Sequence, residues 1–314
     1  MFDWLNQNKK QSSSNSELLD QSAVVRIIGD RGSGKTAYIA SLAYWPNADP
    51  SSPVQTVTSG NSETNELVAE AQNILEQGLQ MGGSDLNDSV GDVKDYSLSI
   101  VLKGQFSFLK NVNAAMKNVN SVMKPQLVQL NISCKDYAGE FFADLVHKVG
   151  DSKLEDYLED CLLANGIMFL ADGTTHRKDS EYANGLDKFL MALDRTDISS
   201  NQRRIAFVMT KCEQSELWVN RYNPRNSAEA RFPQTFRKLQ GWEQRGSGQV
   251  DYFTTSAFGI LGSKYPEPNS KRLKRDRDGT TSVIKDPKRW RPFGLVAPIY
   301  WLCTGERHKE LDKD

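Results

Sequence analysis

The segment that most narrows the possible folds is a glycine-rich turn, Gly29-Asp-Arg-Gly-Ser-Gly-Lys-Thr36. It follows an apolar run at residues 24–28 and precedes a stretch with helical periodicity at 37–44. The pattern Gly-x4-Gly-Lys-Thr between a strand and a helix is typical of loops that bind nucleotide phosphates. We therefore expect an α/β fold with a phosphate site at the carboxyl end of its first strand.

Each residue type in this turn suits a phosphate ligand. The glycines let consecutive backbone N–H groups turn toward a β-phosphate, and the helix N-terminus adds positive potential. Lys35 is expected to bridge the β- and γ-phosphates, and the Thr36 hydroxyl is expected to bind Mg²⁺. The expected phosphate contacts are Gly29, Arg31, Gly32, Ser33, Gly34, Lys35, Thr36 and Ala37.

Short apolar or β-branched runs alternate with helical stretches along the rest of the chain. Such alternation is typical of a mainly parallel sheet with helices on both faces. We expect one three-layer α/β domain with a six-stranded sheet. The expected strands are residues 24–28, 96–102, 127–134, 166–170, 205–209 and 251–255, and the expected helices are 37–44, 63–80, 154–164 and 185–193.

Composition limits the function classes. The 314 residues carry a net charge of −1, which argues against a body built to bind nucleic acid. The four cysteines show no CxxC spacing and the three histidines are scattered, so neither a disulfide framework nor a zinc site is indicated. No leader or membrane-spanning pattern is present, and a reducing cytoplasm is the expected location.

The expected domain covers residues 22–306, between a flexible N-terminal tail (1–21) and a C-terminal tail (307–314). Three inserts interrupt it, at 45–93, 104–125 and 264–291. A heptad-like repeat at 110–123 in the second insert predicts an amphipathic helix that packs either on its own domain or on a partner. The third insert is rich in Lys and Arg, and is either a solvated segment or a contact for an anionic partner, nucleic acid or lipid.

Two further motifs follow expected strands. Asp136 comes after the run 127–134 and is expected to hold a Mg²⁺-bound water opposite Thr36, while Gly139 offers an unobstructed backbone N–H to a γ-phosphate. Thr210-Lys-Cys-Glu213 follows the run 205–209. GTP and ATP differ at the edge of the base, where guanine presents two N–H donors that one carboxylate can accept together.

The ordered set GDRGSGKT, DYAGE, TKCE and SAF resembles the motifs of Ras-like, translation-factor-related GTPases over residues 22–303. The resemblance implies that Lys211 covers the purine face, that Thr210 replaces the usual Asn that tethers the phosphate loop, and that Glu213 replaces the base-reading Asp. It also implies that Ala257 donates its N–H to guanine O6 while Ser256 holds the turn. The implied cofactors are GTP or GDP with Mg²⁺.

Hydrolysis is expected to be slow without a partner. Glu140 stands where Ras-like members have the Gln that orients the attacking water, and it cannot donate as an amide does. Arg31 is either a positive charge near the phosphates or a solvent-facing side chain. The first switch lacks an obvious threonine: Thr56, Thr58 and Ser84 are the candidates to bind Mg²⁺, and Ser84 is preferred because it lies nearer the next strand.

The long first insert, the Thr-Lys-x-acid motif and the closing PFGLVAPIYWLCTG also resemble bacterial double-GTPases of conflict and defence systems. That resemblance implies a partner GTPase or self-association and a regulatory role. The main hypothesis is a GTP-hydrolysing switch that controls a partner protein. The alternative is an interaction module that GTP stabilises and that scarcely hydrolyses it. An ATPase or kinase is disfavoured by the order of the motifs.

Overall fold

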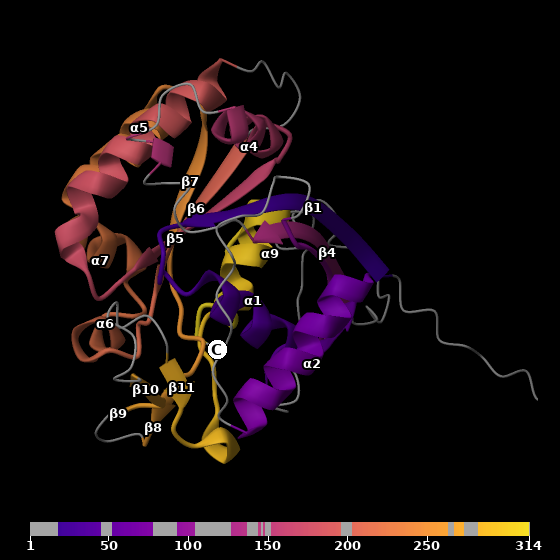
Figure 1. The fold of residues 1–314 in the computed structure, drawn as a ribbon. Coiled ribbons are helices and arrows are strands. Elements are labelled where there is room, and N and C mark those ends of the chain that lie inside the picture. The colour runs from indigo at the N-terminus through magenta and orange to yellow at the C-terminus, as the bar shows by residue number, and fades with distance from the viewer. Residues whose placement is uncertain are drawn as a thin grey trace, which may run out of the picture.

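A seven-stranded sheet forms the centre of the molecule, with strand order β2-β3-β4-β1-β5-β6-β7 (Figure 1). The computed structural model describes residues 18–44, 52–77, 93–103, 127–136, 144–145, 147, 152–195, 203–262, 267–272 and 282–313. Strands β4, β1, β5, β6 and β7 run parallel, whereas β3 is antiparallel to both of its neighbours. The strands are β1 (Leu18–Gly29), β2 (Val54–Ser59), β3 (Asp95–Leu102), β4 (Leu127–Asp136), β5 (Gly166–Asp172), β6 (Arg203–Thr210) and β7 (Gly248–Thr254).

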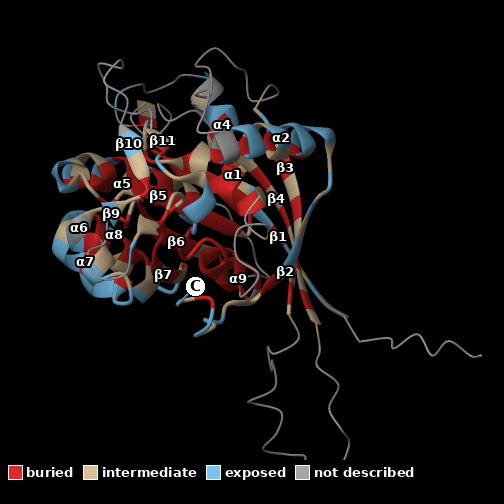
Figure 2. Ribbon diagram, turned by 90° about the horizontal axis from the view of Figure 1, so that it is seen from below, coloured by how far each residue is buried: buried red, intermediate tan, exposed pale blue. Residues whose placement is uncertain are grey.

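Helices cover both faces of this sheet. The strands at its centre are buried and lie between layers of helices (Figure 2). Strand β5 shows why both faces must be covered, because its side chains are buried alternately in two separate cores: Phe169 packs in one and Leu170 in the other. One face carries α1 (Lys35–Tyr44), α2 (Ser62–Gln77) and α9 (Val296–Thr304). The other carries α4 (Ser152–Leu162), α5 (Asp179–Asp194), α6 (Ser215–Val219), α7 (Pro224–Arg231) and α8 (Pro233–Gln244).

The α/β class and all six expected strands are confirmed, but the expected strand count is wrong. The seventh strand, β2, lies within the insert at 45–93 and pairs with β3 at the edge of the sheet. Its sequence Val54-Gln-Thr-Val-Thr-Ser buries only Val54 completely, so it carries little of the apolar signal that marks a central strand. Thr56 and Thr58 lie on this exposed edge strand, three strands away from β1.

Described residues from both expected tails belong to the fold. Strand β1 begins at Leu18 and pairs with β4 from that residue onward, so the end of the expected tail at 1–21 belongs to the sheet. At the other end, Leu311 is buried, and Arg307 forms ion pairs with Asp251 and Asp312. The segment 307–313 therefore packs on the domain and is not a free tail.

The basic insert at 264–291 contains regular structure where it is described. It forms β9 (Glu267–Pro268), which pairs with β8 (Ile260–Leu261), and an antiparallel pair of β10 (Ser270–Arg272) and β11 (Ser282–Ile284). Ile284 and Trp290 are buried in the core, so these parts are not a solvated charge run. The predicted helix within 104–125 lies outside the described residues. None of the described helices is long and apolar enough to span a bilayer.

Candidate functional site

The predicted motifs meet at one edge of the sheet, where the parallel strands end. Along that edge, Ile27 is aligned with Asp136 of β4, and Gly29 is aligned with Leu170 of β5. Strands β5 and β6 end together at Asp172 and Thr210. In parallel α/β sheets, the carboxyl ends of strands are where ligands bind, at the point where strand order changes direction. Strand β1 is such a point, because it lies between β4 and β5, and the chain crosses from one side of β1 to the other between these two strands.

The Gly29–Thr36 loop has a backbone that requires its glycines. A Cβ on Gly29 would lie 2.3 Å from the Leu170 carbonyl oxygen, and Gly32 and Gly34 have φ angles of 74° and 89°. The buried Lys35 folds back over the loop, and its amino group donates to the carbonyl oxygens of Gly29 (2.9 Å) and Asp30 (3.2 Å). The loop is therefore a compact turn that leads into α1.

Thr210 joins this loop to the neighbouring strands. Its hydroxyl oxygen lies 2.5 Å from the Ser33 carbonyl oxygen and 3.1 Å from the Ala171 carbonyl oxygen on β5. Thr210 is also buried. This is the position from which the sequence predicted Thr210 to tether the loop, and the contact fixes the loop relative to the segment that follows β6.

Asp172 is a site residue that the sequence analysis missed. It ends β5, and one of its carboxylate oxygens accepts a hydrogen bond from the Lys211 amino group at 2.6 Å. Burial raises the pKa of Asp172, but the charge and hydrogen bond of Lys211, together with hydrogen bonds from Thr174, bring the pKa below its usual value. The signal was present in the sequence, since Asp172 is the first polar residue after the apolar run 166–171.

Lys178 is a second cation that sequence reasoning did not place here. It belongs to the short 3₁₀ helix η2 (His176–Lys178) after β5, and its amino group pairs with the Asp30 carboxylate in the Gly29–Thr36 loop. The other Asp30 oxygen accepts the N–H of Arg31 at 2.7 Å. The Arg31 residue itself is exposed. The segment after β5 therefore helps to hold the start of the loop.

Glu213 is the most unusual group at this edge. It is only 2% exposed, and its Oε2 atom has no hydrogen-bond partner among the described residues. Burial raises its pKa, an effect that a hydrogen bond with Ser256 and the charge of Lys211 only partly offset. Buried carboxylate oxygens in folded proteins normally have a partner, so Glu213 Oε2 is an exception among the described residues.

The segment Ser256–Ala257 is fixed by contacts on both sides. Ser256 exchanges two backbone hydrogen bonds of 2.9 Å with Phe293, and its hydroxyl accepts the Gly259 N–H at 2.8 Å. The Ala257 carbonyl accepts the indole N–H of Trp290 at 2.8 Å. The Ala257 N–H has no partner within the described residues, so it is available to a ligand acceptor.

Several expected site residues are not placed. Gly139, Glu140 and Ser84 lie outside the described residues, as does the side chain of Asp136. Thr36 and Ala37 lie in the first turn of α1 and are half-buried. Among the described residues, no cluster of three or more metal-binding side chains occurs. The structure thus brings together the loop, Thr210, Lys211, Glu213 and Ser256–Ala257.

Comparison with known proteins does not assign the chain to a family. No family model matches the chain, and no curated protein is similar enough to count as a match.

Proposed function

We propose that this chain binds GTP with Mg²⁺ at the carboxyl edge of its sheet and hydrolyses it slowly to GDP and phosphate, as a switch that regulates a partner protein. The observation that carries the proposal is the buried Glu213 carboxylate, whose Oε2 has no partner among the described residues. It lies on the same edge as the Gly29–Thr36 loop, to which Thr210 connects its segment.

The phosphate half of the proposal rests on the loop. Its glycines allow backbone N–H groups to face one anion, and α1 begins directly behind it at Lys35. A diphosphate would replace the loop carbonyls as the partner of the Lys35 amino group. The hydroxyl of Thr36 is the group that would bind the Mg²⁺, which supplies charge to neutralise the phosphate oxygens.

The base half rests on Lys211, Glu213 and Ala257. The Glu213 carboxylate can accept the two neighbouring N–H donors of guanine, and the Ala257 N–H can donate to its O6. The ion pair with Asp172 anchors the end of the Lys211 side chain, and so restricts the methylene chain that would cover a planar base. Adenine presents an acceptor where guanine has its N1–H, and would leave the buried carboxylate without a donor. A site built to accept hydrogen bonds discriminates strongly against a ligand that lacks the matching donors.

Nucleotide affinity and single-turnover hydrolysis test this proposal. Titration with GTP, GDP and ATP should give tight, Mg²⁺-dependent binding of the guanine nucleotides only, and Lys35→Ala should weaken all binding. Glu213→Ala should remove the preference for GTP, and Glu140→Ala should alter hydrolysis more than binding. If the protein prefers ATP or binds neither nucleotide, the proposal is wrong. Tight GTP binding without turnover, alone or with a partner, would instead favour a nucleotide-stabilised interaction module.

A further inference from the structure

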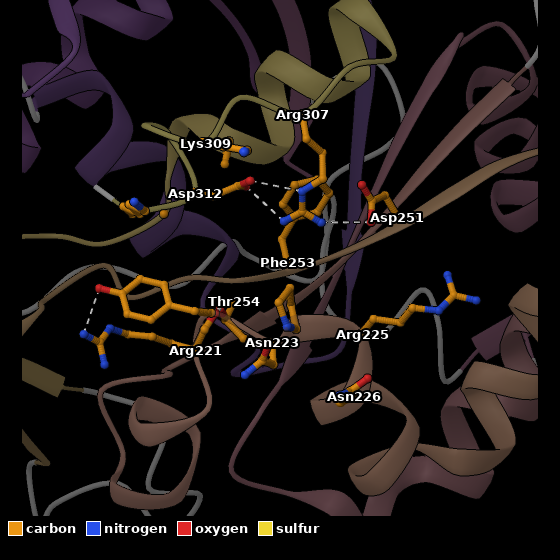
Figure 3. A pocket seen from close by; sticks show the side chains of 15 residues that line it. Arg221, Asn223, Arg225, Asn226, Asp251, Phe253, Thr254, Arg307, Lys309 and Asp312 are labelled. Carbon is orange, nitrogen blue, oxygen red and sulfur yellow. Dashed lines mark hydrogen bonds and ion pairs between the residues drawn. The ribbon is translucent and has the colours of Figure 1, made fainter.

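A cavity of about 630 Å³ lies beside β7, the edge strand of the sheet (Figure 3). Its walls come from the turn between α6 and α7, from the first residues of α7, from β7, from the start of α9 and from the C-terminal segment 307–313. This volume falls in the range of pockets that bind small molecules. The nucleotide proposed above uses Glu213 and Ala257, neither of which lines this cavity.

The charges around the cavity are unbalanced. Five of its lining residues are basic and two are acidic. Both acids pair with a single base: the Arg307 guanidinium binds Asp312 at 2.9 Å and Asp251 at 3.0 Å (Figure 3). The other four bases have no carboxylate partner among the described residues, although the chain as a whole is slightly acidic. These four are Arg221, Arg225, Lys309 and Lys313.

Aromatic rings accompany these charges. The Phe253 ring lies under the Arg307 guanidinium, with 4.6 Å between the guanidinium carbon and the ring centre. The Arg221 guanidinium lies 4.2 Å from the Tyr222 ring centre and donates to the Tyr222 hydroxyl at 2.9 Å. Ala297 adds an apolar patch to the lining. A flat or apolar group can therefore pack in the same cavity that presents the cations.

We propose that this cavity binds a small organic phosphate, with the phosphate held by Lys309, Lys313 and Arg221 and the organic part packed against the exposed ring of Tyr222. A phosphate is favoured over a single carboxylate because it carries up to two negative charges and more acceptor oxygens, and several unpaired cations surround the cavity. Arg307 does not bind the ligand. Its ion pairs hold the C-terminal segment in place, so that the lysines are presented at the rim.

The inference is independent of GTP binding and can be tested separately. The probe is adenosine monophosphate, which lacks the β-phosphate that the Gly29–Thr36 loop is expected to hold. Binding is measured by calorimetry on the full chain, with saturating GDP and Mg²⁺, at one fixed salt concentration. Adenosine and inorganic phosphate report on the two halves of the probe, and a hexaglutamate peptide represents a partner's acidic segment. A parallel titration of the Lys35→Ala variant removes the loop's own contribution.

We expect adenosine monophosphate to bind more tightly than adenosine or phosphate, and equally well to Lys35→Ala. The double variant Lys309→Glu/Lys313→Glu should weaken this binding about tenfold or more, because two attractive charges become repulsive. Arg237→Glu is the matched control: Arg237 is an exposed base on α8, outside the cavity and without a carboxylate partner among the described residues, and its reversal should change little.

Four results would overturn the inference. They are the absence of binding by any phosphate probe, an equal loss of affinity in Arg237→Glu, loss of binding in Lys35→Ala, and tighter binding of hexaglutamate than of adenosine monophosphate. The first would show that the cavity binds no phosphate, and the second that surface cations attract the anion without regard to the cavity. The third would assign the probe to the Gly29–Thr36 loop, and the fourth would identify the cavity as a protein-docking site. Folding of the double variant is checked by its unfolding midpoint, which substitutions at exposed lysines should leave nearly unchanged.

Discussion

Replacing Glu213 by glutamine separates a ligand-binding carboxylate from a structural one. Glutamine keeps the shape of the side chain and an oxygen that can accept from Ser256, but it places an N–H₂ group where the carboxylate has a second acceptor. A carboxylate that is buried for structural reasons should stabilise the fold, and its loss should cost about 1–3 kcal/mol. If the carboxylate instead serves to bind a ligand, its replacement should not lower the free energy of unfolding of the nucleotide-free protein.

We therefore expect opposite effects on binding and on stability. A hydrogen bond to a charged group contributes about 1.5–3 kcal/mol, so loss of the carboxylate should reduce GTP affinity by about 10- to 150-fold. ATP binding should change little. In the absence of nucleotide the free energy of unfolding at neutral pH should stay the same or rise, because burial already disfavours the charged form of Glu213, as its raised pKa shows.

The pKa of Glu213 adds a test in pH. Guanine donors favour the ionised carboxylate, so GTP binding should release a proton, and GTP affinity should rise with pH until the raised pKa is passed. The nucleotide-free protein should behave oppositely: above the reference value of 4.5, its stability falls as pH rises toward the raised pKa. Both trends should disappear in Glu213→Gln.

The assays are calorimetric titration with GTP and ATP, and urea unfolding without nucleotide, over a range of pH. Glu216→Gln is the matched control, because Glu216 is an exposed carboxylate three positions along the chain. If Glu213→Gln keeps the preference for GTP while Glu216→Gln behaves like the wild type, the carboxylate does not read the base. If Glu213→Gln loses stability without nucleotide, the carboxylate is structural and its second oxygen is not a ligand site.

Three further outcomes follow from the same edge of the sheet. Gly29→Ala should lower the free energy of unfolding by about 1–3 kcal/mol in urea titrations, because its Cβ would lie 2.3 Å from a carbonyl oxygen. Gly241→Ala is the control and should raise this free energy by about 0.5–1 kcal/mol, because Gly241 lies inside helix α8. Thr210→Val should weaken nucleotide binding by about 1 kcal/mol in calorimetry, because it removes the hydrogen bond to Ser33. Asp172→Asn should remove the stabilisation that the ionised carboxylate contributes. The wild type has this stabilisation in full above pH 3.8 and loses it as pH falls toward the lowered pKa of Asp172. The free energies of unfolding of the two proteins should therefore converge in acid.

The centre of the parallel sheet was the easiest part to predict, because strands that are buried on both faces are nearly continuous apolar runs. Strands β5 and β6 are of this kind, and both were located to within two residues at each end. Strand β2 could not be located in the same way. It lies at the edge, pairs on one side only and buries little besides Val54, so its stability depends on β3, which is distant in the sequence.

The same distinction holds within the site. The Gly29–Thr36 loop was readable because its glycines are required by its own backbone, and neighbouring residues in the sequence determine that backbone. Asp172 and Lys178 act on groups in other segments, namely Lys211 and Asp30, and such pairing is set by the order of strands in the sheet. No local pattern specifies that order.

For Glu213, the sequence predicted the role and the structure shows the burial of the side chain. Its place in the TKCE motif after β6 led to the prediction that Glu213 reads the base in place of the usual aspartate. In the structure, one oxygen of the Glu213 carboxylate is buried and has no hydrogen-bond partner among the described residues. A longer side chain fixed at Ser256 and buried in this way costs the free protein stability, and a donor ligand would recover it. The strength of guanine recognition should therefore depend on how well Ser256 and its partner Phe293 hold that oxygen in place, rather than on the length of the side chain alone.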